Sequence, residues 1–181
     1  AMQFWINVVV LASTYALLAA GYVLIYRASR VLNLAHGELM MLSAYLLFTL
    51  VGALPHQPLL TIPLTLLLAA GLGVATYYLL IRPLAGRPLF SAVLVTVALG
   101  IMLQGLVVLV WTPRVQYPAA ALGITNQPHQ LPGGGVISTL DALTVLIALA
   151  LFGLLAAFFR YSRLGVQMLA AAENPLLVAQ R

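Results

Sequence analysis

Long blocks of apolar residues, nearly free of charge, most constrain how this chain can fold. A hydrocarbon core of about 30 Å needs about 20 apolar residues in a helix. Three blocks meet that length, namely Phe4–Tyr26, Leu59–Ile81 and Leu89–Trp111. A fourth clear block begins within Ile137–Leu143 and ends at Phe159. Lipid cannot satisfy exposed backbone groups, and none of the blocks alternates like a barrel strand, so we predict membrane-spanning helices.

The composition excludes a water-soluble protein. Only 6% of the 181 residues are charged and 64% are hydrophobic, whereas a soluble domain has about 25% charged residues. The net charge of +5 does not indicate nucleic-acid binding, because the arginines are scattered between apolar blocks rather than clustered on one face. The absence of cysteine excludes disulfides and thiolate metal sites. The first block is too long for a signal peptide. The chain therefore belongs in a lipid bilayer.

One more apolar block follows an unusual polar motif, "NLAHGE", at residues 33–38. The uninterrupted apolar part, Leu39–Leu54, has 16 residues and spans about 24 Å as a helix, which is shorter than the core. Adding Asn33–Glu38 gives 22 residues and about 33 Å. We therefore predict that the motif lies within the membrane's depth or at its edge, on a broken or tilted segment. Gly37 marks the predicted break.

The distribution of the arginines matches the alternating loops of a chain with five spans. Only Arg114 falls in the loop of residues 112–140, where several prolines and the run Gly133–Gly135 predict turns. The other seven lie after the first, third and fifth spans: Arg27, Arg30, Arg82, Arg87, Arg160, Arg163 and Arg181. By the positive-inside rule, we predict an all-α polytopic membrane protein with about five transmembrane helices, an external N-terminus and an external loop at 112–140.

The polar motif itself has two interpretations. On a regular helix one stripe holds Asn33, His36, Met40 and Ser43, while Glu38 points elsewhere. A metal site is not supported, because His36 and Glu38 are two residues apart. A catalytic pair is not supported either, because Ser43 lies about 10 Å along the axis from His36. Ionisable groups at membrane depth favour a role in a pathway. The structural alternative is that Asn33 and His36 link helices by hydrogen bonds while Glu38 reaches the interface or pairs with Arg30.

The motif, followed by "LMMLSAY", resembles the signature of bacterial permeases for branched-chain amino acids, the membrane subunits of ATP-driven importers. The resemblance implies that residues of the motif shape the translocation region. Relatives that import urea or short amides have similar segments, so these substrates stay open. The matched residues are Asn33, Leu34, Ala35, His36, Gly37 and Glu38, and all of them except Leu34 are assigned to the translocation region.

The C-terminal stretch "RLGVQMLAAAENPLLVAQR" gives a second match. From the residues alone it predicts a turn at Gly165 and a short helix interrupted at Pro175, as in an interfacial connector. In the resembled family this position holds the cytoplasmic loop that docks on the ATPase, here beginning at residues 160–181. Leu169 departs from the pattern, which commonly has arginine there. The residues assigned to this loop are Gly165, Ala170, Ala172, Glu173, Asn174, Pro175 and Ala179.

The resemblance implies one transmembrane permease domain over residues 1–181, continued by further helices, in the bacterial inner membrane. It implies as partners a second permease subunit, related or identical, two cytoplasmic ATPases that use ATP and magnesium, and a periplasmic substrate-binding protein. The chain itself would have no catalytic site, metal or cofactor. A secondary transporter and a purely structural membrane subunit remain as alternatives, and an enzyme is the least supported.

Overall fold

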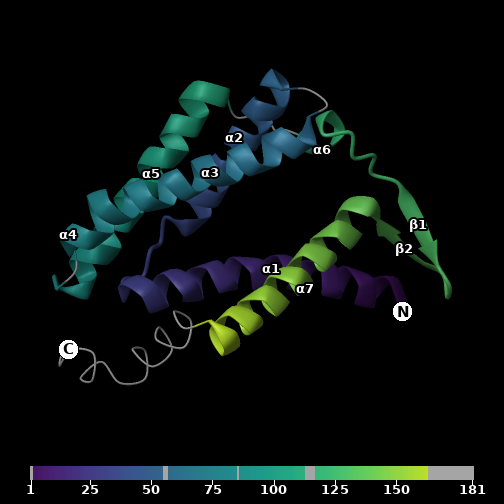
Figure 1. The fold of residues 1–181 in the computed structure, drawn as a ribbon, viewed down its shortest axis with the longest axis horizontal. Coiled ribbons are helices and arrows are strands. Elements are labelled where there is room, and N and C mark those ends of the chain that lie inside the picture. The colour runs from purple at the N-terminus through teal and green to yellow at the C-terminus, as the bar shows by residue number, and fades with distance from the viewer. Residues whose placement is uncertain (1, 55–56, 85, 113–116, 163–181) are drawn as a thin grey trace. The chain divides into compact units, whose positions relative to one another are not determined.

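The computed structural model describes residues 2–54, 57–84, 86–112 and 117–162. Most of these residues are helical, which confirms the predicted all-α class (Figure 1). The elements in order are α1 (Met2–Ser29), α2 (His36–Ala53), α3 (Pro58–Thr76), a π-helical turn η1 (Tyr77–Ile81), α4 (Arg82–Leu84), α5 (Leu89–Trp111), α6 (Pro118–Ala121), β1 (Pro128–Leu131), β2 (Gly135–Ser138) and α7 (Thr139–Tyr161).

Five helices within the described residues are long and apolar enough to cross a membrane, as predicted. The third of them continues α3 through η1 and α4 without a break in the helix. A π-helical turn widens a helix by one residue per turn, and no sequence pattern predicted this one. The five spans are Met2–Arg27, His36–Ala53, Pro58–Leu84, Phe90–Trp111 and Thr139–Tyr161.

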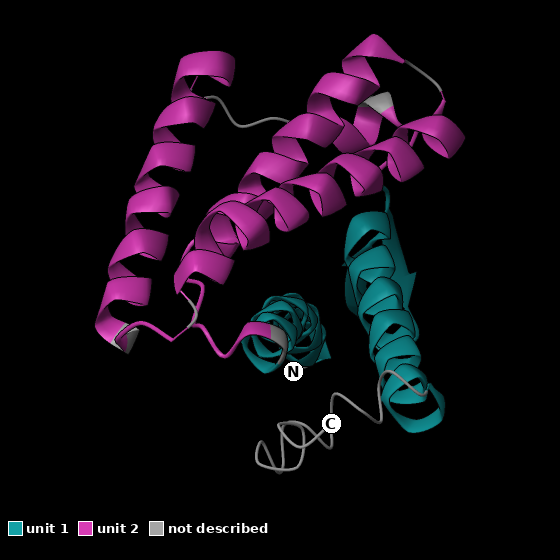
Figure 2. Ribbon diagram, turned by 60° about the vertical axis from the view of Figure 1, so that its left-hand side comes forward, with its two compact units in different colours: residues 1–28, 127–181 teal, residues 29–126 magenta. Residues whose placement is uncertain are grey.

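The chain divides into two compact units, residues 1–28 with 127–181 and residues 29–126 (Figure 2). In the first unit, α1 and α7 run in the same direction. Near the start of both helices, the side-chain amide of Gln3 bonds the backbone of Val136. Near their ends, the Arg27 guanidinium lies 5.7 Å from the ring centroid of Phe159. This parallel arrangement is what a first and a fifth span require.

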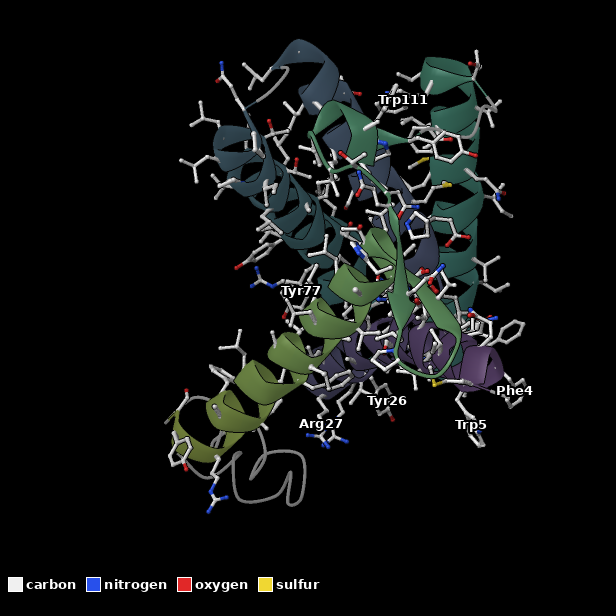
Figure 3. All side chains as sticks on the ribbon, turned by 90° about the vertical axis from the view of Figure 1, so that its right-hand side faces the viewer. Phe4, Trp5, Tyr26, Arg27, Tyr77 and Trp111 are labelled. Atoms are coloured by element: carbon white, nitrogen blue, oxygen red, sulfur yellow. The ribbon has the colours of Figure 1, made fainter. Side chains whose placement is uncertain are left out.

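Aromatic side chains mark the two ends of α1 (Figure 3). Phe4 and Trp5 are exposed near its beginning, with ring centroids 5.6 Å apart. Tyr26 is exposed near its end, beside Arg27. Aromatic rings are enriched at the two membrane–water interfaces. The positions of these rings therefore agree with a helix that spans from one interface to the other.

A two-stranded antiparallel hairpin, β1–β2, precedes α7 where the sequence predicts only turns. Gly133 and Gly134 form the turn with φ of 114° and 83°, a region that glycine adopts without strain. The hairpin is fixed to α1 by Gln3, which donates from Nε2 to the Val136 carbonyl at 3.1 Å and accepts from its N–H at 2.8 Å. Gly135 is buried against the side chain of Ile6.

In the second unit, α2 packs against both α3 and α5. Apolar side chains of α2 and α5 form the core, and several threonines on α3 and α5 face inward. Thr61 and Thr96 are fully buried, and their hydroxyls donate to the carbonyls of Gln57 and Val93 in their own helices. Small hydroxyl residues let membrane helices approach closely, whereas most leucines of α3 are exposed. The core residues are Ala35, Leu42, Leu99, Leu103 and Val107.

Candidate functional site

The polar motif begins in a short non-helical joint between α1 and α2. The hydroxyl of Ser29, the last residue of α1, donates to the Val31 carbonyl at 3.3 Å and accepts from the Val31 N–H at 3.2 Å. Arg30 has φ of 56°, a left-handed conformation that commonly ends a helix. Alternate side chains then turn inward, so that Val31, Asn33 and Ala35 are buried.

Asn33 sets the point at which α2 begins. Its side chain is 4% exposed, and Oδ1 accepts a hydrogen bond from the Ala35 N–H at 3.1 Å. The Asn33 carbonyl accepts a second bond from the His36 N–H at 3.3 Å. This turn competes with a helix for the same backbone groups, and α2 starts only at His36. The single helical stripe predicted to include Asn33 is therefore wrong.

The break in the segment lies before the predicted position. Gly37 is in the first turn of α2, with open space around it among the described residues, so the prediction of a break at Gly37 is wrong. The helix has 18 residues, or about 27 Å, which is slightly less than the hydrocarbon core. The broken segment predicted from the length of the apolar block is thus present, but Asn33 rather than glycine produces it.

The joint packs at one end of the second unit. Val31 lies in a buried cluster with Ile81, from the π-helical turn, and Ala92, from the first turns of α5. Ala35 is fully buried in the core formed by α2 and α5. The residues on either side of Asn33 therefore anchor the motif to three different helical segments.

Replacing Asn33 by alanine should destabilise the protein. The change removes the side-chain oxygen that accepts from the buried Ala35 N–H, and leaving a buried donor unpaired costs about 1–3 kcal/mol. For a chain of this size we expect a fall in Tm of several degrees in detergent, followed by tryptophan fluorescence. Gln104→Ala, at an exposed position of α5, is the matched control. An unchanged Tm in Asn33→Ala would contradict this role of the side chain.

Glu38 lies in the first turn of α2 and is directed toward α5. A Cβ built on Gly100 would meet the Glu38 carboxyl carbon at 3.3 Å and Oε2 at 3.4 Å. The carboxyl group is therefore packed against the bare backbone of α5. Negative charge in the first turn of a helix is favoured by the partial positive charge of that end. The sequence predicts that Glu38 points away from Asn33, but it does not indicate that Glu38 contacts Gly100.

The other end of the α2–α5 pair holds a second polar contact, which the sequence did not predict. The Trp111 indole N–H donates to the Thr49 hydroxyl at 2.7 Å, and its ring centroid lies 5.5 Å from that of Tyr45. Together with the contact at Glu38, this shows that α2 and α5 are parallel. A tryptophan at the end of an apolar block was the available signal, because such a residue commonly sits at the membrane interface.

The five motif residues lie where the joint meets the first turn of α2. His36 is half-buried there, beside Gly37. The second match falls in another part of the chain. The predicted ATPase-coupling residues lie outside the described residues: Gly165, Ala170, Ala172, Glu173, Asn174, Pro175 and Ala179.

Comparison with known proteins covers almost the whole chain. Residues 4–180 match the family described as "Branched-chain amino acid transport system / permease component". The chain is 31% identical over 184 residues to the high-affinity branched-chain amino acid transport system permease protein LivH of Escherichia coli (strain K12). It is 30% identical over 183 residues to the corresponding protein BraD of Pseudomonas aeruginosa.

Each of these alignments covers 96% of this chain and 59% of the relative, so the chain spans about three-fifths of the length of these relatives. No solved structure matches the chain significantly. The five spans and the bacterial relatives confirm a multi-pass protein of the bacterial inner membrane. The match over residues 4–180 carries both motifs and all five spans, and the chain belongs to the family of permease components of branched-chain amino acid transport systems.

Proposed function

We propose that this chain is the permease subunit of an ATP-binding-cassette importer that moves branched-chain amino acids, or related small polar solutes, across the inner membrane. The observation that carries the proposal is the family match over residues 4–180. Relatives that align with 96% of the chain are named as permease proteins of high-affinity branched-chain amino acid transport systems. Urea and short amides are the alternative substrate class.

The joint before α2 supports a role for the motif in translocation. It interrupts the helical path between the first two spans and keeps a buried asparagine and a carboxylate close to each other in sequence. Polar and ionisable groups are costly at membrane depth and usually belong to a substrate or ion pathway. We therefore propose that Asn33, Ala35, His36, Gly37 and Glu38 shape the translocation region.

We also propose that the N-terminus faces the outside. In the first unit, Arg27 and Arg160 lie near the C-terminal ends of the parallel helices α1 and α7. In the second unit, Arg30 lies in the joint before α2, Arg82 begins the short α4, and Arg87 lies just before α5. Each unit taken alone thus collects its described arginines at one end, and arginine-rich ends face the cytoplasm. Residues 112–140 are then the external loop.

Single cysteines test this orientation, because the 181 residues contain none. We expect Gln130→Cys, in the exposed strand β1, to react in intact cells with a maleimide that cannot cross the membrane. Arg87→Cys, exposed before α5, should react only after the membrane is permeabilised. The reverse labelling pattern would contradict the proposed topology.

In this proposal residues 1–181 form one permease domain, and the segment that begins at residues 160–181 couples it to ATP hydrolysis. The chain binds no cofactor and pairs with a second permease subunit, two ATPases that use ATP and magnesium, and a periplasmic binding protein. The test is affinity purification of the full-length protein, tagged and expressed with its neighbouring genes. Recovery of an ATPase supports the importer. A folded, inserted protein without one favours a secondary transporter or a structural subunit.

A further inference from the structure

Glu38 of α2 and Gly100 of α5 are 62 residues apart in sequence. They meet where the two parallel helices pack against each other. Gly100 is buried, and the atoms nearest to its missing side chain all belong to Glu38: Cδ at 3.3 Å, Oε2 at 3.4 Å and Cγ at 3.7 Å. Glycine weakens a helix interior relative to alanine. Its presence in the middle of α5 therefore has a steric reason, since a larger residue would occupy the place of the carboxyl group.

The surroundings make this position tight. Gly100 follows Leu99, a member of the buried core, and lies one turn after Thr96, which is fully buried. Leu103 and Ala35 complete the contact between α5 and the start of α2. By contrast, Gly105 in the same helix is exposed, and a Cβ placed there would meet no described atom within 4 Å outside its own helix. The two glycines of α5 thus face different environments.

We propose that Gly100 is a positioning residue for transport: its bare backbone leaves room for the Glu38 carboxyl group and holds it between α2 and α5. The inference rests on the proposed function, because it assigns Glu38 to the translocation region. It adds a residue of α5 to that region, 62 positions after Glu38 in the sequence. This contact holds the charge at the start of α2, where the helix end favours it, and fixes the direction in which the carboxyl group points.

Substitutions at the two glycines test the functional part in the full-length permease, with its ATPase and binding protein. We expect Gly100→Leu to lower the initial rate of leucine uptake at least about tenfold, because the added side chain overpacks the contact. Gly105→Leu should stay within about twofold of wild type, as is usual for exposed positions. Membrane insertion and yield are measured for both variants.

A rescue experiment separates positioning from general packing. Gly100→Ala moves a Cβ against the carboxyl carbon, and Glu38→Asp withdraws that carbon by one methylene. If the two side chains act on each other, the double variant transports faster than Gly100→Ala alone. Gly105→Ala combined with Glu38→Asp gives no such gain. A double variant no faster than Gly100→Ala alone overturns the proposal.

Cross-linking tests the geometry without reference to transport. Glu38→Cys with Gly100→Cys should form a disulfide under mild oxidation, since the Glu38 Cγ lies 3.7 Å from a Cβ built at residue 100. Glu38→Cys with Gly105→Cys should not. No cross-link in the first pair, or normal uptake in an inserted Gly100→Leu protein, overturns the inference. If the Glu38→Cys, Gly100→Cys pair cross-links but the wild-type permease takes up no leucine, the proposed substrate is overturned instead.

Discussion

Glu38→Gln in the full-length permease should lower uptake of a branched-chain amino acid at least about tenfold, equivalent to about 1.4 kcal/mol of activation free energy. Glutamine keeps the shape of the side chain that packs against Gly100, so the α2–α5 contact is preserved. What is lost is the negative charge in the first turn of α2. A charge kept at membrane depth is costly and is retained mainly for function.

The matched control for this prediction is Asp141→Asn, the same change from acid to amide. Asp141 lies in the first turn of α7, where its carboxylate accepts from the Ser138 hydroxyl at 2.7 Å and its N–H donates to that hydroxyl at 3.1 Å. Asparagine can keep the cap, so we expect uptake near the wild-type rate. Normal uptake in an inserted Glu38→Gln protein would show that the carboxylate serves packing alone.

Glu173→Arg should release the ATPase from the full-length permease and abolish ATP-dependent uptake. The expectation comes from the family resemblance, in which "AAAENP", at residues 170–175, belongs to the loop that docks on the ATPase. Reversing a charge at a docking surface replaces attraction by repulsion, which costs several kcal/mol when the groups are buried together. The measurement is the amount of ATPase recovered with the tagged permease.

Gln167→Arg adds a positive charge to the same segment at a residue outside the matched pattern, and it is expected to retain the ATPase. Insertion of both variants is checked by their yield in the membrane fraction. Equal recovery of ATPase with wild type and Glu173→Arg would refute the assignment of the coupling residues, and it would strengthen the interpretation of this segment as a simple connector.

The spans were predictable because a bilayer imposes length and apolarity on every helix that crosses it. The blocks at Leu59–Ile81 and Leu89–Trp111 correspond closely to the observed spans Pro58–Leu84 and Phe90–Trp111. The shortness of Leu39–Leu54 likewise indicated a broken segment, and α2 does begin only at His36. These features depend on local composition, which a single sequence contains in full.

The remaining features depend on contacts or on competing local bonds. The start of α2 was misplaced because the Asn33 side chain takes the Ala35 N–H, which periodicity does not reveal. Gly100 was missed because its role exists only once α5 lies against Glu38. The hairpin was missed because β1 is exposed along its whole length and has no apolar alternation. A glycine-rich turn followed by "GVIS" was the signal that could have indicated it.

We propose above all that this permease uses ATP hydrolysis to move its substrate. The most direct measurement is uptake of radiolabelled leucine into proteoliposomes that hold the full-length permease and its co-encoded partner subunits, with the binding protein outside. We expect uptake that requires ATP and magnesium inside the vesicles and persists when ion gradients are dissipated. Uptake driven by an ion gradient without ATP would contradict it and identify a secondary transporter.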